Sequence, residues 1–125
     1  MIRIPYVITP ITIPIANGPT VTSTTTPQTT PNQARCIALN DDDLCGIFSG
    51  KLTNWNQVSN PETGLSYSFN APITVIYLPG GDEGTNRMPS RHLASVCTPS
   101  NTASGVTFVE AIMFAASFPN GRVPA

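Results

Sequence analysis

The sequence has few charged residues, and this scarcity narrows what the chain can do. Lys, Arg, Asp and Glu make up 10% of the 125 residues, and the net charge is −1. Soluble domains carry about 25% charged residues on average. A chain without a basic surplus offers no electrostatic footprint to nucleic acid or to an anionic membrane. We therefore expect neither kind of partner.

Histidine and cysteine are also scarce. His92 is the only histidine, and the three cysteines, Cys36, Cys45 and Cys97, contain no C-x-x-C pair. Structural zinc needs clustered Cys and His ligands, so the sequence predicts no metal site and no cofactor. One disulfide and one remaining thiol is the simplest interpretation, and it favours an oxidising compartment. The alternative, a catalytic cysteine with His92 as its base, lacks a pattern that brings the two side chains together.

Long apolar runs are absent. No stretch approaches the 18 apolar residues of a membrane-spanning helix, and the N-terminus lacks the basic-then-apolar layout of a signal peptide. The composition, poor in Lys and Glu and rich in Thr, Asn and Pro, is more typical of exported than of cytosolic proteins, so we expect a periplasmic or extracellular location. If the protein is exported, its signal has been removed or the chain is a fragment.

Proline, glycine and threonine dominate the first part of the chain. Residues 2–16 are apolar and β-branched and predict two short strands, interrupted by prolines and closed by a turn at 17–19. Residues 19–35 form a low-complexity Thr/Pro segment that buries little apolar area. We expect a long extended surface loop there.

The segment that follows predicts a capped helix. Asn40 is an N-cap residue, Asp43 occupies the capping-box position, and Gly50 is a typical C-terminal stop. The run Asp41–Asp43 also invites a calcium interpretation, but the glycine and closing glutamate of a calcium loop do not follow. A second short helical turn is expected at 53–58, with Trp55 as its anchor.

An apolar strand at 73–78 then leads through a glycine-rich turn into a helix expected at about 87–96, with Pro89 in its first turn. This layout directs backbone N–H groups and a helix N-terminus at one spot, which suits an anion. The turn also carries Asp82 and Glu83. Residues 105–118 fit helix or strand, and we favour helix. Alternating strands and helices predict an α/β layer fold.

Three segments resemble periplasmic phosphate-binding proteins of ABC transporters, most closely the DING-type branch. Residues 44–58 (LCGIFSGKLTNWNQV) match their glycine–tryptophan signature, 72–77 their next strand, and Gly84-Thr85 with the helix to Leu93 their phosphate loop. Residues 4–15 are similar to the crossover between their two lobes. The resemblance implies that 1–125 is a single, partial lobe of a three-layer periplasmic-binding-protein-like α/β fold.

The resemblance also implies a phosphate loop. The family pattern is an arginine after the strand, then an acidic residue, then Ser-Gly-Thr. Leu78 occupies the arginine position and Glu83 the serine position, so a positive charge is lost and a negative one gained. Arg87 or Arg91 could replace the missing charge from the helix. The loop residues implied are Gly81, Asp82, Glu83, Gly84 and Thr85.

Several expectations follow from the same resemblance. Cys45 and Cys97 are implied as a disulfide pair, worth about 4 kcal/mol in the chain-entropy model. Inorganic phosphate or another oxyanion is the implied ligand, and the remaining lobe and ABC transporter membrane subunits are the implied partners. Because the loop departs from the pattern and the site lies between two lobes, we expect weak or no phosphate binding by this chain alone.

A different class of function also fits the sequence. The scaffold would then serve as a structural or adhesive extracellular module that holds no ligand and acts through its surfaces or by self-association. The Thr/Pro segment, the low charge and the substitutions Leu78 and Glu83 favour this alternative. No paired carboxylates, metal cluster or catalytic triad can be assembled, so neither alternative is an enzyme.

Overall fold

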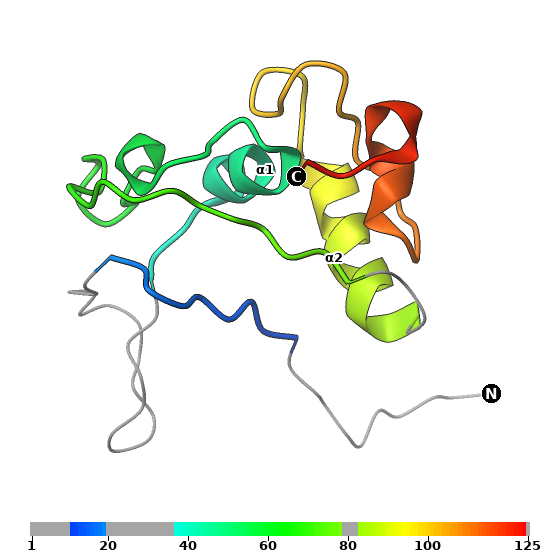
Figure 1. Cartoon of the computed structure of the whole chain (residues 1–125), viewed down its shortest axis with the longest axis horizontal. Coiled ribbons are helices and arrows are strands. Elements are labelled where there is room, and N and C mark those ends of the chain that lie inside the picture. The colour runs from blue at the N-terminus through cyan, green and yellow to red at the C-terminus, as the bar shows by residue number, and fades with distance from the viewer. Residues whose placement is uncertain (1–10, 20–36, 79–82, 125) are drawn as a thin grey trace, which may run out of the picture.

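The computed structural model describes residues 11–19, 37–78 and 83–124. Two α-helices lie next to each other near the middle of the molecule, the segment after the first helix extends to one side, and the C-terminal part packs on the other (Figure 1). The elements are α1 (Asp41–Ser49), α2 (Glu83–Val96) and three 3-10 helices: η1 (Trp55–Gln57), η2 (Phe114–Ser117) and η3 (Pro119–Gly121).

Helix α1 begins and ends where its sequence predicts. The Asn40 side chain accepts from the Asp43 N–H at 2.8 Å, and the Asp43 carboxylate accepts from the Asn40 N–H at 3.4 Å. This reciprocal capping box provides acceptors for two backbone N–H groups that have no partner within the helix. Gly50 ends the helix with φ 80°, a left-handed conformation that glycine adopts without steric cost.

The predicted second turn is the 3-10 helix η1. Asn54 caps it by accepting from the Asn56 N–H at 3.1 Å, and Gln57 closes a capping box by accepting from the Asn54 N–H at 3.0 Å. Trp55 is 5% exposed and contacts Tyr67 edge-on at 6.2 Å between ring centroids. Its role as the anchor of this turn is confirmed.

The predicted strands do not form a sheet in the described residues, where the β-pairing consists of two isolated bridges, Asn54 with Pro72 and Ser59 with Ser66. Residues 73–78 continue beyond the first bridge, and no strand of the described part of the chain pairs with them there. Residues 11–15 are exposed and belong to no strand, and 2–10 lie outside the described residues, as does most of the Thr/Pro segment. The described residues therefore do not display the three-layer arrangement.

Two helix predictions need correction. Helix α2 begins at Glu83 rather than near residue 87, so Pro89 lies inside it and not in its first turn. Residues 105–113 form neither helix nor ladder, and only η2 is helical in the predicted 105–118 segment. The burial pattern is not that of a helix face either, because Phe108 is buried while Ile112, four residues further on, is 37% exposed.

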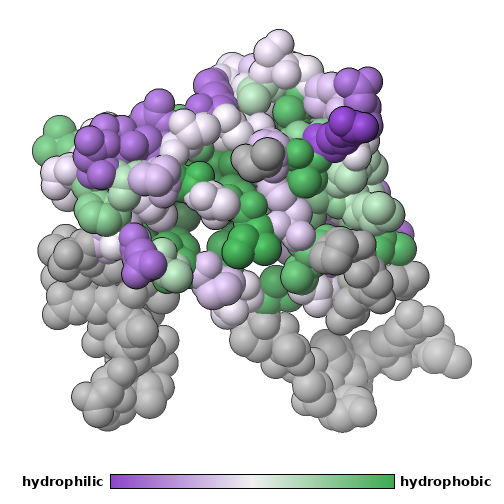
Figure 2. Space-filling model, in the orientation of Figure 1, coloured by the Kyte–Doolittle hydropathy of each residue, from purple (hydrophilic) through white to green (hydrophobic). Residues whose placement is uncertain are grey.

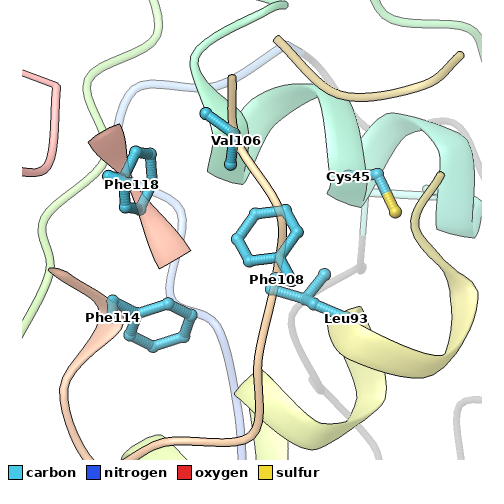
Figure 3. Close-up of a cluster of buried hydrophobic side chains, with 6 residues drawn as sticks. All are labelled: Cys45, Leu93, Val106, Phe108, Phe114 and Phe118. Atoms are coloured by element: carbon cyan, nitrogen blue, oxygen red, sulfur yellow. The ribbon is translucent and has the colours of Figure 1, made fainter. Parts of the chain in front are cut away.

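The main core lies between α1, α2 and the C-terminal segment (Figure 3). Phe108 and Phe118 meet edge-on at 6.2 Å between centroids, and Tyr77 contacts Phe114 and Phe118, each at 5.7 Å. Aromatic pairs in such orientations add to the free energy of apolar burial. The buried members are Cys45, Leu93, Val106, Phe108, Phe114 and Phe118.

A second, smaller cluster lies under η1 and contains Ile47, Trp55 and Val58. Residues Ile73 and Val75 pack on it from the extended segment. Apolar surface is not fully covered, however: on the face seen in Figure 2, apolar side chains gather beneath a polar rim. Large exposed apolar side chains in the described residues include Ile11, Ile13, Ile76, Leu78 and Met88.

The two α-helices are held together covalently and by polar contacts. The Cys45–Cys97 disulfide joins α1 to the end of α2, and it is the pair that the family resemblance implies. His92 Nε2 lies 2.8 Å from an Asp41 carboxylate oxygen, and the Asn101 amide donates to Asp42 at 2.7 Å. Neither described helix is long and apolar enough to cross a membrane.

Candidate functional site

The candidate loop connects the end of the extended segment with the start of α2. Leu78 is the last described residue before the loop, and α2 begins at Glu83. Gly81 and Asp82 lie outside the described residues. Glu83 and Gly84 form the first backbone turn of α2, and Thr85 is exposed in that turn. The described part of the predicted site is therefore the N-terminal turn of a 14-residue helix.

Asn86 fixes the geometry of this junction. It is 4% exposed, and its side-chain amide donates to the Leu78 carbonyl at 3.3 Å. The bond ties the first turn of α2 to the end of the extended segment across the loop. Sequence reasoning did not single out Asn86. The available signal was a short polar side chain directly after Gly84-Thr85, at a point where a loop needs a local backbone partner.

Leu78 occupies the position where the resemblance expects an arginine. It is 53% exposed, so the side chain is directed at solvent rather than into either core cluster. The position would accept a longer, charged side chain without repacking the interior.

Two arginines of α2 converge on one carboxylate. Arg87 Nε donates to Glu110 Oε1 at 2.8 Å, and Arg91 Nε lies 3.9 Å from Glu110 Oε2. All three side chains are at least 38% exposed, so these ion pairs contribute little to stability. The two arginines and Glu110 leave one net positive charge beside α2. Arg87 and Arg91 thus both contact Glu110, a partner that sequence reasoning did not foresee.

The alternative of a catalytic cysteine is excluded for two of the three thiols. Cys45 and Cys97 are oxidised to the disulfide, and His92 contacts Asp41 instead of a sulfur atom. Cys36 lies outside the described residues. In residues 11–19, 37–78 and 83–124, no group of three His, Cys, Asp or Glu side chains is placed to hold a metal ion.

Burial raises the pKa values of three ionisable groups, Asp43, Tyr67 and Tyr77. Burial raises the pKa of Asp43 above its ordinary value of 3.8, partly opposed by hydrogen bonds from the Ser59 and Asn40 N–H groups. Burial raises the pKa of Tyr77 to about 12. The Tyr77 hydroxyl donates to the Phe48 carbonyl at 2.6 Å. Asp43 and Tyr77 both hold α1 to its surroundings through these hydrogen bonds.

A shallow apolar cavity of about 350 Å³ lies beside α1 and α2. Its polar contribution comes from His92, whose ring already contacts Asp41. The cavity is lined by Ile11, Ile13, Leu44, Phe48, Met88, Pro89, His92 and Leu93. This lining offers no cluster of donors for an anion, so the cavity is distinct in chemistry from the start of α2.

Comparison with known proteins agrees with the sequence resemblance. Residues 3–118 match the family model described as the PBP superfamily domain. The chain is 40% identical over 82 residues to "Alkaline phosphatase L" of Pseudomonas aeruginosa (strain UCBPP-PA14), covering 66% of this chain and 18% of the relative. It is 32% identical over 111 residues to the protein of the same name from strain PAO1, covering 89% and 24%.

A third relative carries a different name. The chain is 30% identical over 124 residues to "Phosphate-binding protein" from an unknown prokaryotic organism, covering 99% of this chain and 26% of the relative. The chain thus spans about a quarter or less of the length of these curated relatives. No solved structure matches it significantly. Because the family model covers nearly all of its length, the chain belongs to the PBP superfamily of periplasmic-binding-protein-like domains.

Proposed function

We propose that the chain is the phosphate-loop part of a solute-binding module, and that it binds inorganic phosphate or a similar oxyanion weakly when alone. The observation that carries this proposal is the junction of the extended segment with the N-terminus of α2, tied by the Asn86–Leu78 bond. The backbone N–H groups and the helix dipole at a helix N-terminus favour an anion. The relatives named for phosphate binding and phosphatase activity make phosphate the first ligand to test.

The weakness follows from charge. A guanidinium at position 78 would contribute charge-assisted hydrogen bonds of about 1.5–3 kcal/mol each, and Leu78 contributes none. A carboxylate about 4 Å from phosphate costs on the order of 4 kcal/mol at an effective dielectric constant of 20. Glu83 is the residue that would introduce this cost. The positive charge left by Arg87, Arg91 and Glu110 lies one to two turns further along α2.

The wider setting is proposed from the family. A solute-binding protein of this type closes two lobes over its ligand, so we propose that 1–125 acts as a partial lobe and that the remaining lobe completes the site. ABC transporter membrane subunits would be its partners in the periplasm or outside the cell. Binding without turnover is the proposed activity, although two relatives carry the name of a phosphatase.

Isothermal titration with inorganic phosphate tests the proposal. We expect a dissociation constant in the millimolar range or no detectable heat. Micromolar affinity would contradict the proposed weakness. Incubation with p-nitrophenyl phosphate serves as the test of turnover: we expect no product above the buffer rate, and sustained hydrolysis that scales with protein concentration would contradict a purely binding role.

A further inference from the structure

The carboxylate of Glu110 occupies the position that a bound anion would take between the two arginines of α2. Its oxygens are divided between them: Oε1 accepts from Arg87 Nε at 2.8 Å, and Oε2 lies 3.9 Å from Arg91 Nε. Residues four apart on a helix lie on one face, so the carboxylate bridges two guanidinium groups of that face. Phosphate and carboxylate ligands use their oxygens in the same way when they bind arginine.

The position of Glu110 is set by the residue after it. Both backbone groups of Ala111 form hydrogen bonds with the hydroxyl of Ser90, which is fully buried on α2. Ser90 lies between Arg87 and Arg91 in the sequence, so this anchored backbone brings Glu110 to both arginines. In most surface ion pairs two long side chains must be ordered before they meet. Here the backbone next to one partner is already held in place.

Arg87 is the arginine of α2 that stands nearer to the start of the helix. Position 87 follows position 83 by one turn, about 5.4 Å along the axis, and the two positions share a face. Helical side chains also lean toward the N-terminus of their helix. A guanidinium at position 87 can therefore reach the first turn of α2, whereas Arg91 starts a full turn further away.

We propose that Glu110 is an affinity-determining residue of the anion site at the start of α2, because it competes with the ligand for Arg87. The Arg87 Nε–H is committed to Glu110, and Leu78 supplies no guanidinium from the other side of the loop. Without the carboxylate, Arg87 turns toward the first turn of α2 and binds an oxyanion there. This inference rests on the proposed function, since it names what sets the affinity of that same site.

The residue at position 83 strengthens the expected effect. Glu83 is the acidic residue that opposes a phosphate at the start of α2. A glutamate followed four residues later by an arginine is the favourable order for an ion pair on a helix. Arg87 released from Glu110 would therefore offset the charge at position 83 as well as attract the ligand. Both consequences raise the affinity for an oxyanion.

The charges also indicate which anions should respond most. Coulomb energy scales with the product of the two charges, so a divalent anion gains more than a monovalent one from the release of a guanidinium. Guanidinium groups also match the geometry of phosphate oxygens. We therefore expect the gain to be larger for inorganic phosphate at about pH 8, where it is mainly a dianion, than for formate.

Titration calorimetry with inorganic phosphate compares the wild type with Glu110→Gln, which keeps the size of the side chain and removes its charge. We expect the affinity to rise at least fivefold. Glu62→Gln is the matched control, because it removes the same charge from another exposed glutamate. Glu62 belongs to the segment after η1, which lies on the opposite side of α1 from α2 (Figure 1). This variant should change the affinity less than twofold.

Double variants assign the gain to one arginine. Arg87→Gln/Glu110→Gln should return the affinity to the wild-type value or below it, whereas Arg91→Gln/Glu110→Gln should keep most of the gain. All these side chains are exposed, so the variants should fold, and their urea midpoints check this. A gain that persists without Arg87, or equal gains in Glu110→Gln and Glu62→Gln, would overturn the proposal.

The double variant Leu78→Arg/Glu83→Ser, which restores the family pattern of the loop, separates this inference from the proposed function. If that variant gains affinity and Glu110→Gln does not, the loop is the site and Glu110 does not control it. If neither variant binds phosphate, the proposed function and this inference are both wrong. If Glu110→Gln gains affinity through Arg87 while the loop variant gains none, the competition stands and the loop is not the site.

Discussion

The Ser90 hydroxyl forms hydrogen bonds with both backbone groups of Ala111, the carbonyl and the N–H. It donates to the Ala111 carbonyl at 2.8 Å and accepts from the Ala111 N–H at 3.1 Å. Ser90 is fully buried on α2, and Ala111 lies in a segment without regular structure. One side chain of the helix thus supplies the hydrogen bonds that a ladder or a helix would supply elsewhere.

Ser90→Ala should therefore destabilise the fold more than its size suggests. The substitution leaves both backbone groups of Ala111 without this partner in a partly buried place, at a cost of about 1–3 kcal/mol each if water cannot reach them. Urea unfolding followed by Trp55 fluorescence measures the loss. Ser95→Ala is the control, because Ser95 is exposed and bonds only within its own helix turn. Equal effects of the two variants would contradict the assigned role.

Reduction of the Cys45–Cys97 disulfide should lower the free energy of unfolding. The bond closes a sequence separation of 52 residues, and the chain-entropy model gives about 4 kcal/mol for a loop of that length. Because small domains are stable by only about 5–15 kcal/mol, the reduced chain should be close to unfolded at 37 °C. The measurement is the urea midpoint with and without dithiothreitol. An unchanged midpoint would contradict this prediction, because it would show that the disulfide adds nothing to the free energy of unfolding.

Because of Asp43, the free energy of unfolding should fall as the pH rises above about 3.8. Burial raises its pKa in the folded state above the unfolded value near 3.8, so between the two values the folded state holds more protons. Stability then falls as the pH rises through that window. Asp43→Asn should remove this slope while losing part of the capping box, at a cost of about 1 kcal/mol. The readout is the difference in unfolding free energy between wild type and variant from pH 3 to 7.

Tyr77 should make the fold sensitive to alkali. Its pKa is about 12 in the folded state against 10 in the unfolded chain, so ionisation disfavours folding. Stability should therefore decline as the pH rises from 10 through 12. In Tyr77→Phe this decline should be smaller, and at neutral pH the lost bond to the Phe48 carbonyl should cost about 1 kcal/mol. Parallel alkaline slopes in both proteins would contradict the assignment.

Restoring the family pattern should create phosphate affinity. The double variant Leu78→Arg/Glu83→Ser returns a guanidinium and removes a carboxylate, and we expect at least a tenfold gain in affinity measured by titration calorimetry. Leu65→Arg adds the same charge at another exposed leucine and should gain little. If the two variants gain equally, the effect is general electrostatics, and the loop is not the site.

Local signals in the sequence predicted the local structure well. The cap of α1, its end at Gly50 and the turn around Trp55 depend on residues within a few positions of one another, and all are confirmed. The disulfide pair came from the family resemblance, since no local pattern selects two of the three cysteines.

Features that depend on distant residues were not predicted. Residues 105–113 are held by hydroxyl groups that lie outside the segment. Ser90 is 21 residues from Ala111, and the Ser117 hydroxyl, eight residues from Val109, accepts from the Val109 N–H at 3.1 Å. Hydrogen bonds from side chains to the backbone produce no periodic pattern of apolar residues in the sequence, so the sequence does not predict them. The expected sheet likewise requires neighbouring strands for residues 73–78, and the described residues supply only the bridge at Pro72.

The disulfide has a topological consequence. Residues 46–96 lie inside the covalent ring that Cys45 and Cys97 close. They include η1, the extended residues 73–78, the glycine-rich turn and α2. A single protease cut anywhere in this ring opens it without releasing a fragment. The loop before α2 can therefore be cut, lengthened or replaced by a foreign sequence while both of its flanks remain tethered to one molecule.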